Sequence, residues 1–79
     1  PSPLPMRLAI LTISDAASRG ARVDASGDAI ADWARARGVA SVVRALVPDD
    51  TAAIAARLAA WCDDDAADVV LTTGGTGLA

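Results

Sequence analysis

Histidine is absent from the 79-residue sequence, and cysteine occurs once, as Cys62. No internal disulfide can therefore form, and no Cys/His metal cage can be written. No apolar run approaches the roughly 20 residues that a membrane-spanning helix needs. Lysine is missing too, so the seven basic residues are scattered arginines in a chain of net charge −3. These features argue against nucleic acid or anionic lipid as the main partner and favour a reducing cytoplasm.

The composition is apolar for a short chain, with 53% hydrophobic residues and a mean hydropathy of +0.38. A chain of this length is one small domain at most, near the lower limit of what a single core stabilises. The apolar surplus indicates missing partner surface, supplied either by further chain or by association of subunits. Residues 1–5 are too short and too rich in proline for a signal peptide, and we expect them to be a flexible lead-in.

Three apolar stretches predict strands. Residues 6–13 form an almost unbroken apolar run, which suits a strand buried on both faces. Val39–Val47 predicts a second strand, which Pro48 ends because proline cannot donate to a continuing ladder. Residues 69–71 predict the third. Residues 14–25 form a polar connection that is long for an α/β unit, and such loops often carry function.

Two patterns predict helices between the strands. The first has Ser26 as its N-cap and stops at Gly38, with an apolar face of Ile30, Trp33 and Ala34. The second begins near residues 49–51 and should end by Cys62, because the acidic residues 63–65 oppose the helix dipole and belong in solvent. Its apolar face consists of Ile54, Leu58, Trp61 and Cys62. Both tryptophans and Cys62 are thus expected in the core.

This order predicts an α/β fold, a three-layer open sheet that is mostly parallel and built of βαβαβ units, as in half of a Rossmann-like domain. Crossovers between parallel strands are right-handed, so the three strand carboxyl ends should share one edge of the sheet. Open α/β folds bind ligands at that edge. There the topology gathers Ser14 and Asp15, Asp49, and the glycine cluster that follows the third strand.

The glycine cluster is the strongest local signal. Its glycines allow backbone N–H groups to approach an anion closely, and its threonine adds a hydroxyl donor. The alternative is a tight turn that only releases the chain from the sheet. Neither a P-loop nor a dinucleotide-binding glycine pattern is present. The cluster consists of Gly74, Gly75, Thr76 and Gly77.

Carboxylates near a phosphate-binding loop are the usual means of holding Mg²⁺ between protein and phosphates. Asp49 and Asp50 could instead only cap the second helix, although one can cap while the other points into the cleft. Asp15 and Asp24 could simply form Asx turns in the loop. Nucleotide or phosphate-ester chemistry is the leading functional class.

As a set, four segments of the chain resemble the molybdenum cofactor biosynthesis family of MogA and MoaB type, whose domain recurs in gephyrin. The resemblance extends from residue 6 to the last residue, in order and at compatible spacing. The segments are residues 11–15, 24–27, 47–50 and 71–79.

The resemblance implies a molybdopterin adenylyltransferase, in which ATP with Mg²⁺ donates AMP to the terminal phosphate of molybdopterin and pyrophosphate leaves. It implies that Asp49 is the catalytic aspartate and binds the metal, and that Ser14 and Asp24 lie near the nucleotide. It implies a homo-oligomer, a trimer or larger, that binds these small molecules, whereas the cytoplasmic location and the lack of nucleic-acid or membrane partners are expected from the composition. The implied phosphate contacts are Gly74, Gly75, Thr76 and Gly77.

In that family the chain continues past the glycine loop, with a second functional aspartate and further strands and helices. We therefore expect residues 6–79 to be the N-terminal part of a single domain, truncated after the loop, which binds nucleotide weakly and does not catalyse alone. Two alternatives stay open. One is a non-catalytic molybdopterin-binding or scaffold protein of the MoaB branch, and the other is a nucleotide pyrophosphate hydrolase domain of the CinA type.

Overall fold

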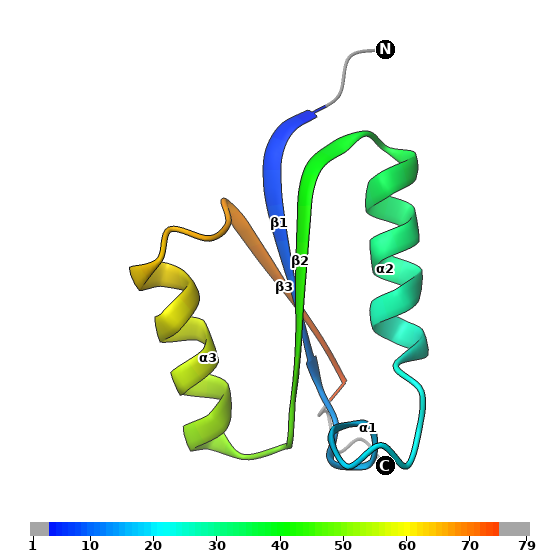
Figure 1. The fold of residues 1–79 in the computed structure, drawn as a ribbon, viewed down its shortest axis with the longest axis vertical. Helices are drawn as coiled ribbons and strands as arrows, with labels where there is room; N and C mark the ends of the chain where they lie inside the picture. Colours follow the sequence, from blue (N-terminus) through cyan, green and yellow to red (C-terminus); the bar gives the residue numbers. More distant parts are fainter. Residues whose placement is uncertain (1–3, 75–79) are drawn as a thin grey trace.

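A computed structural model describes residues 4–74 and confirms the predicted α/β class (Figure 1). Strands and helices alternate along these residues, and one additional short helix lies in the polar connection after the first strand. The elements are β1 (Leu4–Ile13), α1 (Asp15–Ser18), α2 (Ala25–Ala36), β2 (Val39–Val47), α3 (Thr51–Asp63) and β3 (Val69–Gly74). None of the helices in this part of the chain is long and apolar enough to cross a membrane.

The three strands form one parallel sheet in the order β2-β1-β3. The central strand β1 begins at Leu4, two residues before the predicted start. At its other end, Ile13 is paired with Val47 of β2 and with Gly74 of β3. The strand carboxyl ends thus stop at the same level, as predicted, and Figure 1 shows α1 beside this edge.

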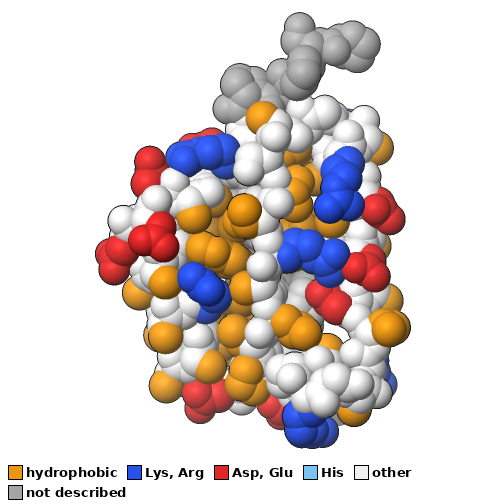
Figure 2. Space-filling model, viewed as in Figure 1, with side chains coloured by type: hydrophobic (Ala, Val, Ile, Leu, Met, Phe, Trp, Pro, Cys, Tyr) orange, Lys and Arg blue, Asp and Glu red, His pale blue; other side chains and the backbone are white. Residues whose placement is uncertain are grey.

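The helices cover opposite faces of the sheet, which makes the three predicted layers (Figure 1). Alternate residues of β1 point to opposite faces, since side chains alternate along a strand. Leu8 and Ile10 pack with α2, whereas Ala9 and Leu11 pack with α3. These four residues are between 0% and 2% exposed, so β1 is buried on both faces. Figure 2 shows hydrophobic side chains gathered between β2 and each flanking helix.

Helix α2 differs from the prediction in its N-cap and in its buried face. Asp24, not Ser26, is the N-cap, and its carboxylate accepts a hydrogen bond from the Gly27 N–H. The buried residues of α2 are Gly27, Ala31 and Ala34, which are small and let the helix lie close to the sheet. Trp33 is therefore directed to the flank and is 52% exposed, so the prediction that it is a core residue is wrong.

Helix α3 has Asp50 as its N-cap and ends at Asp63, one residue later than predicted. Trp61 is 7% exposed and belongs to the core, as predicted. Cys62, by contrast, is exposed, because it follows Trp61 by one residue and so lies about 100° further round the helix. The prediction that Cys62 is a core residue is therefore wrong.

The acidic residues after α3 are exposed, as predicted, but they are not simply solvated. Arg7 of β1 forms ion pairs with Asp65 and Asp68, with Nη2–Oδ1 distances of 3.2 and 2.9 Å. Asp68 accepts a second bond from the Arg7 backbone N–H. Its hydrogen bonds with Arg7 lower the pKa of Asp68 and raise the pKa of Arg7. These contacts fasten the start of β3 to β1, at the end of the sheet away from the cleft described below.

Part of the apolar surplus seen in the composition is found on the edge strand β3. Val69, Val70 and Leu71 are 39%, 37% and 37% exposed, although the residues opposite them on β1 are buried. Apolar residues on both faces of a strand are typical of a strand covered on both sides. That further chain or a second subunit covers β3 stays a prediction.

Candidate functional site

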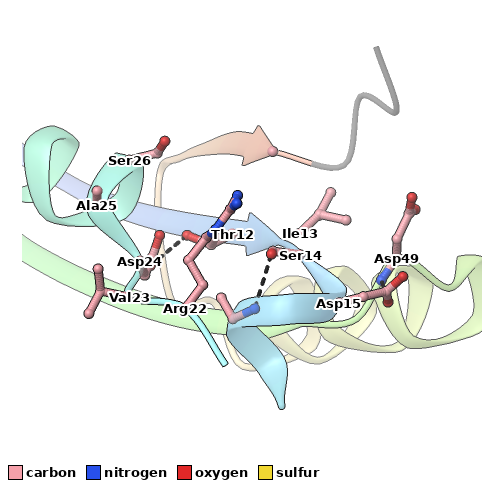
Figure 3. A pocket seen from close by; sticks show the side chains of 12 residues that line it. Thr12, Ile13, Ser14, Asp15, Arg22, Val23, Asp24, Ala25, Ser26 and Asp49 are labelled. Atoms are coloured by element: carbon pink, nitrogen blue, oxygen red, sulfur yellow. Dashed lines mark hydrogen bonds between the residues drawn. The ribbon is translucent and has the colours of Figure 1, made fainter. Parts of the chain in front are cut away.

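A cleft of about 370 Å³ lies at the carboxyl edge of the sheet (Figure 3). The end of β1, helix α1, the loop after it, the start of α2, the β2–α3 turn and the end of β3 contribute to it. Its lining therefore combines segments from all parts of the chain, as the topology predicts. The lining residues are Thr12, Ile13, Ser14, Asp15, Ala17, Arg22, Val23, Asp24, Ala25, Ser26, Asp49 and Gly74.

Asp15 and Asp49 come together at one side of this cleft (Figure 3). The Asp15 Oδ1 atom accepts a 2.9 Å hydrogen bond from the Asp49 backbone N–H, which joins the chain after β1 to the chain after β2. Asp50 caps α3 through its own carboxylate, which leaves the neighbouring Asp49 carboxylate exposed at the cleft. The arrangement matches the expectation that one aspartate of the pair caps the helix while the other faces the cleft.

Ser14 also lies in the cleft, but its groups hold the local backbone. Its N–H donates to the Val47 carbonyl at 2.9 Å, and its hydroxyl oxygen accepts from the Ala17 N–H at 3.2 Å as the N-cap of α1. The hydroxyl retains its own proton for donation to a bound group. That Ser14 contacts a nucleotide stays a prediction.

Asp24 is the centre of a network that also includes Thr12, Gly27 and Arg44, hereafter the Asp24 network. Its Oδ1 accepts from the Gly27 N–H at 3.0 Å. Its Oδ2 accepts from the Thr12 hydroxyl at 2.8 Å and from Arg44 Nη2 at 2.9 Å. Arg44 also pairs with Asp28, at 2.8 Å from Nη1 to Oδ1. The carboxylate of Asp24 thus ties the start of α2 to β1 and β2.

The Asp24 network stabilises the negative charge of the Asp24 carboxylate. Burial opposes its ionisation, but the hydrogen bonds from Gly27, Thr12 and Arg44 outweigh that effect and lower the pKa of Asp24. Arg44 donates hydrogen bonds to Asp28 and Asp24, and these bonds raise the pKa of Arg44. Both carboxylate oxygens of Asp24 are engaged, which gives this residue a structural role. Its predicted contact with nucleotide stays a prediction.

Two glycines are required where the backbone passes close to other atoms. Gly74 has φ +80°, and a Cβ there would collide with the Ile13 carbonyl oxygen. A Cβ on Gly27 would collide with the Asp24 carboxylate. Gly74 has a positive φ, which glycine adopts without steric cost, and it lines the cleft. The rest of the predicted phosphate-contacting cluster, Gly75, Thr76 and Gly77, lies outside the described residues.

The donors in the cleft fit a metal that is shared with a substrate. No group of three or more His, Cys, Asp or Glu side chains that could hold a metal occurs within residues 4–74. Mg²⁺ usually takes only one or two carboxylates and completes its shell with water and substrate phosphates. Asp15 and Asp49 supply that number of carboxylates at the cleft. These residues thus fit Mg²⁺ with a phosphate substrate rather than a closed protein cage.

Three residues of the site were missed in the sequence. Thr12 is 4% exposed, and it lies on the same face of β1 as Leu8 and Ile10, which is the face that α2 covers. Arg44 could have been noticed, since it is the one charged residue within the apolar Val39–Val47 strand. Arg22 carries no sequence signal, because its position in the cleft depends on how the polar loop folds.

An open parallel α/β sheet with its cleft at the strand carboxyl ends defines the class of α/β ligand-binding domains. The chain belongs to the molybdenum cofactor biosynthesis family of MoaB and MogA type. The family model described as "Probable molybdopterin binding domain" matches residues 9–79.

Individual relatives agree with this assignment. Molybdenum cofactor biosynthesis protein B of Escherichia coli K12 is 44% identical over 75 residues, which cover 95% of this chain and 43% of that protein. A molybdenum cofactor biosynthesis bifunctional protein of Chlorobaculum tepidum is 35% identical over 72 residues, covering 91% of this chain and 23% of that protein. The chain thus spans less than half the length of these curated relatives.

Solved structures show the same fold. The tungsten cofactor synthesizing protein MoaB from Pyrococcus furiosus superposes with a TM-score of 0.79 at 35% identity, over 99% of this chain and 48% of that one. The molybdopterin biosynthesis enzyme MoaB from Thermus thermophilus gives a TM-score of 0.75 at 41% identity, over 94% and 46% of the two chains. These agreements confirm both the predicted family and the predicted fold class.

Proposed function

We propose that the intact protein adenylylates molybdopterin, using ATP and Mg²⁺ and releasing pyrophosphate, in molybdenum cofactor biosynthesis. The observation that carries this proposal is the hydrogen bond from the Asp49 N–H to the Asp15 carboxylate. It joins Asp15 to the backbone of Asp49 in a cleft that also includes Gly74, the first residue of the glycine cluster. Carboxylates beside a backbone anion site suit the transfer of a phosphate-linked group.

In this reaction a terminal phosphate oxygen of molybdopterin forms a bond to the α-phosphorus of ATP, and the bond from that phosphorus to the pyrophosphate oxygen breaks. The protein needs no covalent nucleophile, because positioning and charge neutralisation supply most of the catalysis. Asp15 and Asp49 would hold Mg²⁺, and the ion when bound neutralises phosphate charge. Ser14 would donate its hydroxyl proton to a bound oxygen, and Gly74 keeps the wall of the cleft open.

Asp49 is positioned for this role by the fold rather than by its own side chain. Its backbone N–H is held by Asp15, and the next residue, Asp50, is held by its cap on α3. The exposed Asp49 carboxylate is therefore presented on an ordered turn between β2 and α3. Groups that are positioned before the substrate arrives lose little entropy when it binds.

Further parts of the proposal concern the intact protein. We expect it to act in the cytoplasm as a homo-oligomer, a trimer or larger, with molybdopterin and ATP as its ligands and without nucleic acid or membrane partners. The exposed apolar residues of β3 support the burial of additional surface in such a protein.

A non-catalytic molybdopterin-binding or scaffold role is a second candidate. The relatives described above include protein B of Escherichia coli and two MoaB structures, which favours the MoaB branch. The two candidates differ in one measurable quantity, since a scaffold protein would bind molybdopterin without releasing pyrophosphate.

The test incubates the intact protein with molybdopterin, ATP and Mg²⁺ and follows pyrophosphate release together with the mass of adenylyl-molybdopterin. We expect turnover, and we expect Asp49→Asn to reduce kcat by about 100-fold or more, because charge stabilisation by a bound metal is worth several kcal/mol. Asp63→Asn, at an exposed position outside the cleft, is the matched control and should leave kcat unchanged. Binding of molybdopterin without any turnover would reject the proposed enzymatic activity and support the scaffold role.

A further inference from the structure

Arg22 is the single cation among the described residues that line the cleft, and its charged neighbours there are Asp15, Asp24 and Asp49. A cleft lined by carboxylates alone would repel a substrate that carries several negative charges. The Asp24 charge is already matched by Arg44. Arg22 is thus the positively charged group in this part of the cleft that is able to bind an anion and neutralise its charge.

The other arginines support this assignment because most of them have partners within residues 4–74. Arg7, Arg35 and Arg44 form ion pairs with aspartates. Arg37 and Arg57 lie over the rings of Trp33 and Trp61, at 5.4 and 5.2 Å from the ring centroids. Only Arg19 and Arg22 have neither kind of contact in this part of the chain, and of these two only Arg22 lines the cleft.

The loop that carries Arg22 is anchored on both sides. On the N-terminal side, the Ala21 N–H donates to the Ala16 carbonyl at 2.8 Å, which fixes the loop to α1. On the C-terminal side, Asp24 is held by its own network. Arg22 stands between these anchors, so its backbone is placed before any ligand binds. Figure 3 shows its side chain on the same side of the cleft as Asp24 and Ser26, with Asp15 and Asp49 on the other side.

We propose that Arg22 is a specificity-determining residue that binds a phosphate group of the anionic substrate. Its planar guanidinium can donate two parallel hydrogen bonds to phosphate oxygens, which selects phosphate over neutral ligands. The assignment rests on the proposed function only in locating the substrate in this cleft. The phosphate belongs either to the nucleotide or to the pterin, and both present the same chemistry to Arg22.

The test measures equilibrium binding by calorimetry to the intact protein and to its Arg22→Ala, Arg22→Lys and Arg19→Ala variants. The probes are ATP with Mg²⁺, inorganic pyrophosphate with Mg²⁺, molybdopterin, and adenosine as the ligand without phosphate. We expect Arg22→Ala to weaken the binding of at least one phosphate ligand by about 10- to 100-fold, as expected for hydrogen bonds to a charged group. Arg22→Lys should retain part of that affinity, since lysine keeps the charge but lacks the fork.

Arg19→Ala is the matched control, because Arg19 is exposed on the same loop but does not line the cleft. It should change every affinity by less than about twofold, as is usual for an unpaired surface charge. Adenosine binding should be the same in all four proteins. Weaker binding of ATP and pyrophosphate in Arg22→Ala would assign Arg22 to the nucleotide, and weaker binding of molybdopterin alone would assign it to the pterin phosphate.

Equal binding of all the phosphate ligands by the unsubstituted protein and Arg22→Ala would overturn the assignment. An equal loss of affinity in Arg19→Ala would also overturn it, because the loss would then follow from the net charge of the protein and not from a contact with Arg22. If the protein binds phosphate through Arg22 but never releases pyrophosphate, the role of Arg22 is supported and the proposed enzymatic function is rejected. Absence of binding of any of the phosphate ligands to the unsubstituted protein would reject both.

Discussion

The hydroxyl of Thr12, which is 4% exposed, donates a 2.8 Å hydrogen bond to Asp24 at the start of α2. Thr12 is the last buried residue of the central strand, and Asp24 is the N-cap of the helix that covers one face of the sheet. The bond therefore fixes the beginning of α2 against the end of β1. Because both residues line the cleft, the same contact that supports the fold also shapes the site.

Replacing Asp24 by alanine should destabilise the protein by about 2 kcal/mol. Loss of an N-cap costs about 1 kcal/mol, and a buried Thr12 hydroxyl left without its acceptor adds about as much again. Urea unfolding of the intact protein measures the change. Asp28→Ala is the control, because Asp28 also pairs with Arg44 but its side chain is 64% exposed, and it should cost less than about 1 kcal/mol. If Asp24→Ala and Asp28→Ala cost the same free energy of unfolding, the ion pairs with Arg44 alone would account for the stability that the Asp24 network provides.

The contribution of Asp24 should depend on pH in a defined direction. The network lowers the pKa of Asp24 in the folded state. A carboxylate with a lowered folded-state pKa stabilises the protein above its unfolded pKa, about 3.9, and this stabilisation is lost as the pH falls through the folded value. The free energy of unfolding should therefore differ between the wild type and Asp24→Asn by a constant amount from pH 7 to 5.

Below about pH 4 this difference should shrink. Asparagine can still accept the hydrogen bond of the N-cap, so the comparison isolates the charge of Asp24. Asp68, whose pKa is also lowered, titrates in both proteins and cancels. A difference that stays constant down to pH 2 would mean that the ionised form of Asp24 contributes nothing.

The sheet and its functional edge were predictable because they depend on patterns within each segment. Pro48 ends a strand wherever the strand lies, and parallel strands with helical crossovers must end at one edge. Asp49 and Gly74 were located at the cleft for that reason. The position of Trp33 was not predictable, because a periodic stripe does not reveal that small residues on α2 pack closer to the sheet.

The polar connection after β1 was the least predictable part of the site. Its short helix α1 spans only Asp15–Ser18, which is too short to show a period. Asp24 and Ser26 are both good N-cap residues, and only the position of Thr12 and Arg44 selects Asp24. Arg22 and Arg19 cannot be distinguished in the sequence, since the fold of this loop alone brings one of them to the cleft.

The two tryptophans should respond very differently to truncation. Trp61 is 7% exposed and packs with Leu11 and Val47, so Trp61→Ala should cost about 3 to 5 kcal/mol. Trp33 is 52% exposed, and its contact with Arg37 is the kind of exposed cation–π pair worth about 0.5 to 1 kcal/mol. Trp33→Ala should therefore cost about 1 kcal/mol or less in urea unfolding. A loss at Trp33 as large as that at Trp61 would mean that the intact protein buries the Trp33 side chain.

Two glycines with nearly equal positive φ values allow backbone strain and side-chain collision to be separated. Gly20 and Gly74 have φ values of +77° and +80°, so alanine should be strained at both positions by about 1 kcal/mol. No atom lies within 4 Å of a Cβ at Gly20, whereas a Cβ at Gly74 would collide with the backbone carbonyl of Ile13. Gly20→Ala should then cost about 1 kcal/mol, and Gly74→Ala about 3 kcal/mol, because overpacking adds a further cost of about 2 kcal/mol.

Urea unfolding of the intact protein with each substitution tests this expectation, with Gly20→Ala as the control for backbone strain alone. The additional loss at Gly74 has a functional meaning, because Ile13 and Gly74 are paired at the level where the cleft begins. A side chain there would push β3 away from β1 at this wall of the cleft. If the two variants lose equal stability, β3 can move away from β1 at little cost, and the close approach at Gly74 is not what positions this wall of the cleft.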